Sequence, residues 1–184
     1  MAGAQQNAAA QGKQLKVMFM DEARFGRITE PRRCWAPKGC RPLVLKQAIR
    51  QYTYAYGAVC PAEEGFDSLI LPDMRAECLN VFLAELSRRH PDAPILLFMD
   101  GAGSHKARNI TVPANITFHQ LPPYSPECNP TENLWDEMRE KDFANHTFHS
   151  MQAVETTLVQ SLRRLEANPD LVRSITSFPW IICS

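Results

Sequence analysis

Three acidic side chains stand where predicted secondary-structure elements begin or end. Asp21 and Asp100 each follow an apolar run, and Glu132 lies in the first turn of a predicted helix after the proline-rich segment 121–130. Tyr124, Ser125 and Asn129 are expected to lock that loop. Hard divalent cations such as Mg²⁺ prefer oxygen ligands. Two such ions can activate an attacking oxygen and stabilise a leaving oxygen in phosphoryl transfer. The three acids therefore predict a metal-dependent catalytic site.

The elements that must position these acids predict an α/β fold. Short apolar and aromatic runs predict strands at 15–20, 33–37, 51–59, 66–71, 95–99 and 116–120, with a further apolar piece at 43–46. Helices are expected at 75–89 with Asp73 as N-cap, at 104–109, at 130–143 with Trp135 as a core anchor, and at 150–167 with Ser150 as N-cap. Antiparallel strands come first and a strand–helix–strand crossover follows. This order predicts a mixed β-sheet flanked by helices.

The predicted sheet can bring the acids together. If the strands before Asp21 and Asp100 are neighbours, both carboxylates meet at one edge of the sheet. Pro130 suits the first position of a helix, and that helix could then aim Glu132 at the other two. Glu22 is not expected to reach the site, because adjacent strand residues point to opposite faces. A structural alternative stays open for each acid, since Asp is an ordinary turn residue and Glu complements the helix dipole.

The composition indicates one domain and argues against several classes of protein. The chain has 184 residues and a formal net charge of zero, so any nucleic-acid surface must be a local basic patch. Six cysteines without a CxxC pair argue against a zinc site and predict reduced thiols in a cytosolic protein. Residues 1–14, rich in Ala and Gln, are expected to be a disordered tail or linker. No apolar run approaches the roughly 20 residues that span a membrane.

Four segments resemble, in their order along the chain, the DDE transposases of the IS630/Tc1/mariner superfamily. They are MDEARFG around Asp21, WAPKG at 35–39, FMDGAGSHKA around Asp100 and, most specific of the four, LPPYSPECNPTENLW around Glu132. The resemblance covers residues 16–143. It implies that these three acids are the catalytic, metal-binding Asp, Asp and Glu of the family. The 31 residues between Asp100 and Glu132 are close to what this superfamily places there.

The resemblance also implies a fold and an organisation. An RNase H-like catalytic domain is expected over residues 15–184. Full-length members carry helix-turn-helix domains upstream, so a DNA-binding region is expected to be missing or separately encoded. The chain departs from the family pattern where Cys128 and Thr131 replace the usual Leu and Ile, and where Gly101 replaces a common Asn. If that Asn orients a metal ligand, its loss would weaken activity.

The activity implied by the resemblance is cleavage and strand transfer at transposon ends during DNA transposition. Two Mg²⁺ or Mn²⁺ ions, double-stranded DNA, a short TA-containing target and a homodimer are the expected cofactors and partners, in a bacterial cytoplasm at the nucleoid. Two alternatives stay open. One is a degenerate or domesticated transposase fragment that binds DNA without turnover. The other is a ribonuclease H-type enzyme, although the Glu132 motif points away from it.

Basic residues cluster after Asp21 and predict a DNA-facing surface, because Arg and Lys neutralise phosphates. A solvated basic loop explains the cluster equally well. Two further basic residues follow Asp100 and are expected either to contact phosphate or a neighbouring acid, or to start a helix. The predicted DNA contacts are Arg24, Arg32, Arg33, Trp35, Lys38, His105 and Lys106.

Overall fold

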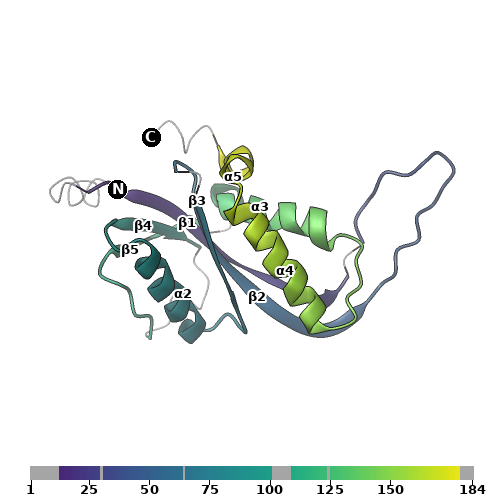
Figure 1. Ribbon diagram of the computed structural model, residues 1–184, viewed down its shortest axis with the longest axis horizontal. Coiled ribbons are helices and arrows are strands. Elements are labelled where there is room, and N and C mark those ends of the chain that lie inside the picture. The colour runs from purple at the N-terminus through teal and green to yellow at the C-terminus, as the bar shows by residue number, and fades with distance from the viewer. Residues whose placement is uncertain (1–12, 30, 64, 101–108, 124, 179–184) are drawn as a thin grey trace.

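A five-stranded sheet forms the centre of the protein, and helices cover both of its faces (Figure 1). The structure is a computed structural model that describes residues 13–29, 31–63, 65–100, 109–123 and 125–178. The strands are β1 (Lys16–Ile28), β2 (Ala48–Cys60), β3 (Gly65–Leu71), β4 (Ile95–Met99) and β5 (Ile116–Gln120). Their order across the sheet is β3-β2-β1-β4-β5.

The sheet is mixed, as the element order predicts. β1 and β2 pair antiparallel, as do β2 and β3, whereas β4 runs parallel to both β1 and β5. The hairpin of β2 and β3 and the strand–helix–strand crossover into β4 are both confirmed. The expected neighbourhood of the strands that carry Asp21 and precede Asp100 is confirmed as well, because β1 pairs directly with β4.

β1 runs well beyond the apolar run that predicted it. Its parallel pairing with β4 ends at Phe19 and Phe98, but its antiparallel pairing with β2 continues to Ile28. The prediction that Asp21 ends the strand is therefore wrong. Asp21 lies inside β1, opposite Gly57 of β2, just beyond the point where the pairing with β4 stops. Hydrogen bonding to β2 keeps the polar half of β1 extended, which hydropathy alone does not reveal.

Residues 31–47 form an extended arm between β1 and β2 that projects from the body of the protein (Figure 1). The strand predicted at 33–37 is wrong, and no strand forms anywhere in this fully described stretch. Three prolines interrupt it, and proline cannot donate to a strand ladder. Two of its apolar side chains, Trp35 and Leu43, are 103% and 99% exposed.

Helix α2 (Ala76–Arg89) covers one face of the sheet and confirms the helix predicted at 75–89. The prediction that Asp73 is the N-cap of this helix is wrong. Arg75 holds the cap position, and Asp73 instead accepts a hydrogen bond from the Arg75 backbone N–H at 2.9 Å. The apolar face of α2 packs against alternate residues of the strands. This layer contains Leu79, Phe82, Leu83, Leu86, Met18, Met20, Tyr56 and Leu97.

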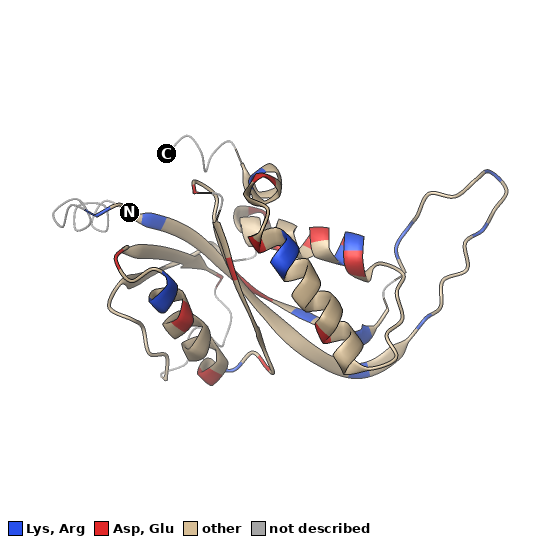
Figure 2. Ribbon diagram, in the orientation of Figure 1, with Lys and Arg blue, Asp and Glu red and all other residues tan. Residues whose placement is uncertain are grey.

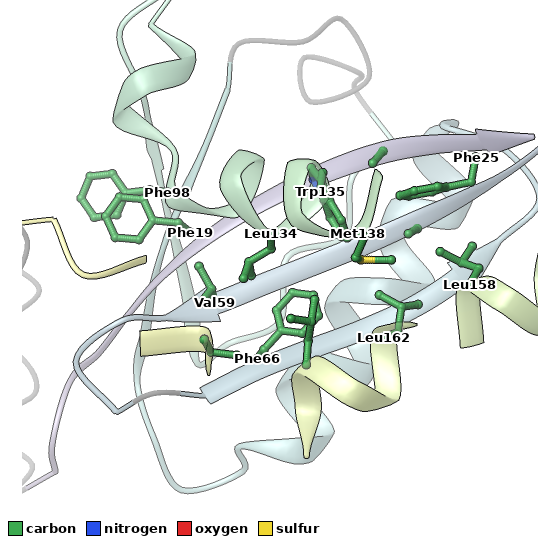
Figure 3. Close-up of a cluster of buried hydrophobic side chains, with 14 of the residues drawn as sticks. Phe19, Phe25, Val59, Phe66, Phe98, Leu134, Trp135, Met138, Leu158 and Leu162 are labelled. Atoms are coloured by element: carbon green, nitrogen blue, oxygen red, sulfur yellow. The ribbon is translucent and has the colours of Figure 1, made fainter. Parts of the chain in front are cut away.

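The other face carries α3 (Pro130–Met138), α4 (Met151–Glu166) and α5 (Pro169–Thr176) (Figures 1 and 3). A π-helical turn, Arg139–Phe143, extends α3 to the predicted end at residue 143. Ser150 caps α4 by accepting a hydrogen bond from the Ala153 N–H, as predicted, whereas α5 was not anticipated. The helix predicted at 104–109 lies almost entirely outside the described residues. Within the described part of the chain, no helix has the length and apolarity needed to cross a membrane.

Candidate active site

Asp21 lies on the sheet face that α3 covers and is almost buried, with 8% of the residue exposed. Its Oδ2 accepts a hydrogen bond from the indole Nε1 of Trp135 at 2.9 Å. Burial raises the pKa of Asp21 from 3.8 to about 8, with smaller contributions from the negative charges of Glu132 and Glu22. A carboxylate in this environment is stabilised by gaining either a proton or a cation.

Two buried polar side chains dock the start of α3 on β1, directly before Asp21. The Asn129 Nδ2 donates to the Met20 carbonyl at 3.0 Å, and the Thr131 hydroxyl donates to the Phe19 carbonyl at 2.7 Å. The Asn129 Oδ1 also caps the helix by accepting from the Thr131 N–H at 3.2 Å. The expected locking role of Asn129 is confirmed. Thr131 makes a bond that the isoleucine usual in the resembling family could not make.

This docking places Glu132 beside Asp21. Burial raises the pKa of Glu132, the positive charge of Arg139 opposes the rise, and the negative charges of Asp136 and Asp100 add to it. Glu132 therefore interacts electrostatically with both of the other candidate acids. Asp100 directly follows β4 and is exposed. The last β1–β4 pair is Phe19 with Phe98, so Asp21 and Asp100 each stand two residues beyond the end of the same paired stretch.

The donor chemistry of these residues fits a divalent cation. Carboxylate oxygens are the ligands that hard cations prefer, and a cation would relieve the mutual repulsion that helps to raise the pKa values of Asp21 and Glu132. Among the residues that the structure describes, no group of three His, Cys, Asp or Glu side chains lies close enough together to hold a metal ion. The described residues thus bring the three acids to one region of the sheet without closing them around a common point.

Residues 16–155 match the model of a protein family described as DDE superfamily endonuclease. The chain belongs to this family. The uncharacterized protein y4pE/y4sA of Sinorhizobium fredii is 36% identical over 130 residues, which span 70% of this chain and 96% of that protein. The family model confirms the DDE part of the resemblance that the four motifs carry.

Solved Mos1 transposase complexes share the fold. The strand transfer complex has a TM-score of 0.54 at 15% identity, covering 96% of this chain and 60% of that chain. The pre-cleavage transpososome has a TM-score of 0.59 at 14% identity, covering 94% and 59%. The mariner paired end complex with Mn has a TM-score of 0.55 at 16% identity, covering 96% and 61%. The predicted RNase H-like fold is confirmed, and the chain spans about 60% of the length of these transposase chains.

Glu22 is turned away from the acids of this DDE domain, as the strand alternation predicts. Burial raises the pKa of Tyr56, and the negative charge of Glu22 is the next largest cause. Tyr56 belongs to the layer that α2 covers, on the face opposite α3. The side chains of Asp21 and Glu22 thus lie on different faces of the sheet.

Sequence reasoning missed Arg139 and gave Trp135 only a core role. The Arg139 guanidinium lies 3.6 Å from the Asp136 carboxylate and over the Phe25 ring, 5.8 Å from its centroid. It stands seven residues after Glu132, two helical turns along the same face. That spacing could have identified it. The hydrogen bond of Trp135 had no comparable signal in the sequence.

A cavity of about 340 Å³ lies at the root of the arm, and three arginines are among the residues that line it. The Arg24 guanidinium stacks on the Tyr52 ring, 4.5 Å from its centroid, and Arg32 pairs with the Glu140 carboxylate at 2.6 Å. Arg139 forms part of the wall as well, so the cavity adjoins the region of Glu132. Its aromatic walls and cationic groups suit the backbone of a nucleic acid.

The predicted DNA contacts fall into three groups. Arg24 and Arg32 line the cavity at the root of the arm. Arg33, Trp35 and Lys38 lie on the exposed arm itself. His105 and Lys106 lie outside the described residues. The structure therefore brings five of the seven residues to one end of the protein.

Proposed function

We propose that this DDE domain is the catalytic domain of a transposase, which cleaves DNA at transposon ends and joins the freed 3′-OH to target DNA. The observation that carries the proposal is the electrostatic interaction of Glu132 with both Asp21 and Asp100, in a member of the DDE endonuclease family. DDE-family transposases use divalent metals, and Mos1 paired end complexes with Mn and with Mg are known.

In this mechanism Asp21, Asp100 and Glu132 would hold two Mg²⁺ or Mn²⁺ ions. When bound, the ions would supply activation of the attacking water or 3′-OH and stabilisation of the leaving oxygen. The protein fixes where the carboxylates stand. Asp21 is held by the rigid β1 backbone and Trp135, and Glu132 by the docked start of α3.

The experiment that tests this proposal uses the chain with duplexes that carry the terminal sequences flanking its gene. With Mg²⁺ or Mn²⁺ we expect nicked duplex and, on addition of TA-containing target DNA, joined product. Chelation should stop both reactions. Cutting of RNA–DNA hybrids alone would instead support a ribonuclease H-type enzyme. If calorimetry detects no metal binding that Asp21→Asn abolishes, the chain is a degenerate fragment.

The arm is the proposed DNA-facing surface. Residues 31–47 carry five basic residues and no acidic one (Figure 2), and the arginine-lined cavity lies at their root. Replacing Arg33 and Lys38 together by Ala should lower DNA affinity. The slope of log K against log[salt] should also fall by about 2, because each lost phosphate contact removes roughly 0.9. The measurement is a salt titration of DNA binding by fluorescence anisotropy.

A matched control replaces two exposed arginines at the ends of α2, on the opposite face. Arg75 and Arg88 have side chains 79% and 73% exposed. Changing both to Ala removes the same charge and should leave the slope unchanged. An equal loss of slope in both double variants would mean that net charge, and not the arm, governs binding.

The proposal also includes a homodimer and a separate DNA-recognition region. The arm exposes Trp35, Leu43 and Leu45 side by side with its basic residues, and exposed apolar groups of this kind mark interaction sites. We assign them to a second copy of the chain in a homodimer on DNA, which sedimentation of the DNA complex tests. An upstream or separately encoded helix-turn-helix region would supply recognition of the ends, at the nucleoid in the bacterial cytoplasm.

A further inference from the structure

Trp135 combines a core position with a polar contact to a candidate metal ligand. The residue is fully buried, and its Nε1–H donates to Oδ2 of Asp21 at 2.9 Å. Indole nitrogen can only donate, so the bond is strongest when Asp21 is ionised. Trp135 stands three residues after Glu132, and α3 therefore carries one candidate ligand and a hydrogen-bond donor to another.

The packing around the indole fixes the direction of its N–H group. The rings of Phe25 and Phe66 meet it edge-on, with centroids 6.3 and 6.0 Å away and interplanar angles of 73° and 71°. Figure 3 shows Trp135 on α3 within this buried cluster, with Phe25, Leu134 and Met138 around it. A ring enclosed in this way cannot rotate to another acceptor without displacing its neighbours.

The strand opposite Asp21 is shaped to admit the indole. Gly57 of β2 pairs directly with Asp21 in the antiparallel ladder. A Cβ atom on Gly57 would lie 2.6 Å from Cη2 of Trp135 and 2.8 Å from Cε2 of Phe66. Glycine inside a strand weakens it and often marks a close approach. Here the missing side chain lets the indole reach over β2 to the acid on β1.

We propose that Trp135 is a positioning residue of the metal site, orienting the Asp21 carboxylate for a divalent cation. The inference rests on the proposed function, since it requires Asp21 to be a ligand. Each carboxylate oxygen has further acceptor capacity, so the indole bond fixes the orientation of the group without blocking it. Partners that orient metal ligands typically contribute about 10- to 100-fold to metal affinity or activity.

Trp135→Phe removes the donor and keeps an aromatic ring, although the smaller ring leaves part of the indole's space unfilled. We expect Mn²⁺ affinity, measured by calorimetry without DNA, to fall about tenfold or more. The kcat of DNA cleavage should fall as well, with the KM for DNA unchanged because Trp135 is buried. Met138→Leu is the control: it alters the same core by a volume-conserving change and should leave metal affinity as it is.

A second readout leaves Trp135 and the aromatic rings around it unchanged. The chain has three tryptophans, and the indole N–H signal of Trp135 in a ¹⁵N-labelled sample is assigned by elimination with Trp35→Phe and Trp180→Phe. This signal should shift on Asp21→Asn and on addition of Mg²⁺, but not on Glu22→Gln. It keeps the inference testable even if Trp135→Phe fails to fold.

The outcomes separate this inference from the proposed function. A wild-type chain that neither binds Mn²⁺ nor cleaves DNA overturns both. If the wild-type chain binds Mn²⁺ and cleaves DNA, and Trp135→Phe has the same Mn²⁺ affinity and kcat, only the positioning role of Trp135 is overturned. An indole signal that ignores both Asp21→Asn and Mg²⁺ has the same consequence.

Discussion

Replacing Asp21, Asp100 or Glu132 by its amide is expected to abolish DNA cleavage, with single-turnover rates at least roughly a thousandfold lower. The amides preserve size but remove the charge and most of the affinity for a hard cation. Metal ions contribute several kcal/mol of transition-state stabilisation, and about 1.4 kcal/mol corresponds to a tenfold change in rate. The measurement is a cleavage time course at saturating Mn²⁺, with folding checked by circular dichroism.

Neighbouring acids supply the controls for this loss. Glu22→Gln changes the residue next to Asp21, but on the face that α2 covers. Asp136→Asn changes an exposed acid one turn after Glu132 on the same helix. Both variants should stay within a few-fold of the wild-type rate. An Asp100→Asn variant with full activity would show that the assigned mechanism is wrong.

The sequence predicts the placement of the acids better than the local structure around them. The order of elements correctly made neighbours of β1, which carries Asp21, and β4, which precedes Asp100. The predicted end of β1 came too early, because hydropathy carries no information on the hydrogen bonds that β2 makes with polar residues of β1. The sequence pattern assigned a strand to residues 33–37, because short apolar runs look alike whether or not a partner strand exists.

The contacts that shape the site depend on tertiary structure. Trp135 was expected in the core from helical periodicity, which gives a face of the helix but no hydrogen-bond partner. Gly57 carries no signal in sequence, because its role arises only where α3 crosses β2 opposite Asp21. Thr131 looked like a minor departure from the family pattern, yet its hydroxyl docks α3 on β1. These contacts join segments more than seventy residues apart.

Raising the pH from about 5 to 8.5 is expected to destabilise the metal-free protein, and Asp21→Asn should remove much of that loss. The pKa of Asp21 is raised from 3.8 to about 8, so between these values the folded state keeps a proton that the unfolded chain has released. Stability is therefore fully present below the unfolded pKa and is lost as the pH rises through the folded pKa. The raised pKa of Glu132 acts in the same direction.

The expected loss is a few kcal/mol, or roughly 5–10 °C in Tm for a domain of this size. Glu85, whose pKa is lowered to about 2, acts in the opposite direction, but only at pH values below its unfolded pKa of 4.5. The measurement is thermal unfolding with chelator at pH 5, 6.5 and 8.5. Asparagine keeps the shape of the side chain and still accepts the Trp135 hydrogen bond, so Asp21→Asn tests the charge alone.

Divalent metal distinguishes a metal site from a merely buried acid. If Asp21 and Glu132 bind Mn²⁺, the ion should restore Tm at pH 8.5 and have little effect at pH 5, because metal binding requires deprotonated ligands. Asp21→Asn should lose this metal response while keeping a high Tm at pH 8.5. Parallel declines of Tm in the wild type and in Asp21→Asn would show that the pH dependence originates elsewhere. Equal stabilisation of both proteins by Mn²⁺ would exclude Asp21 as a ligand.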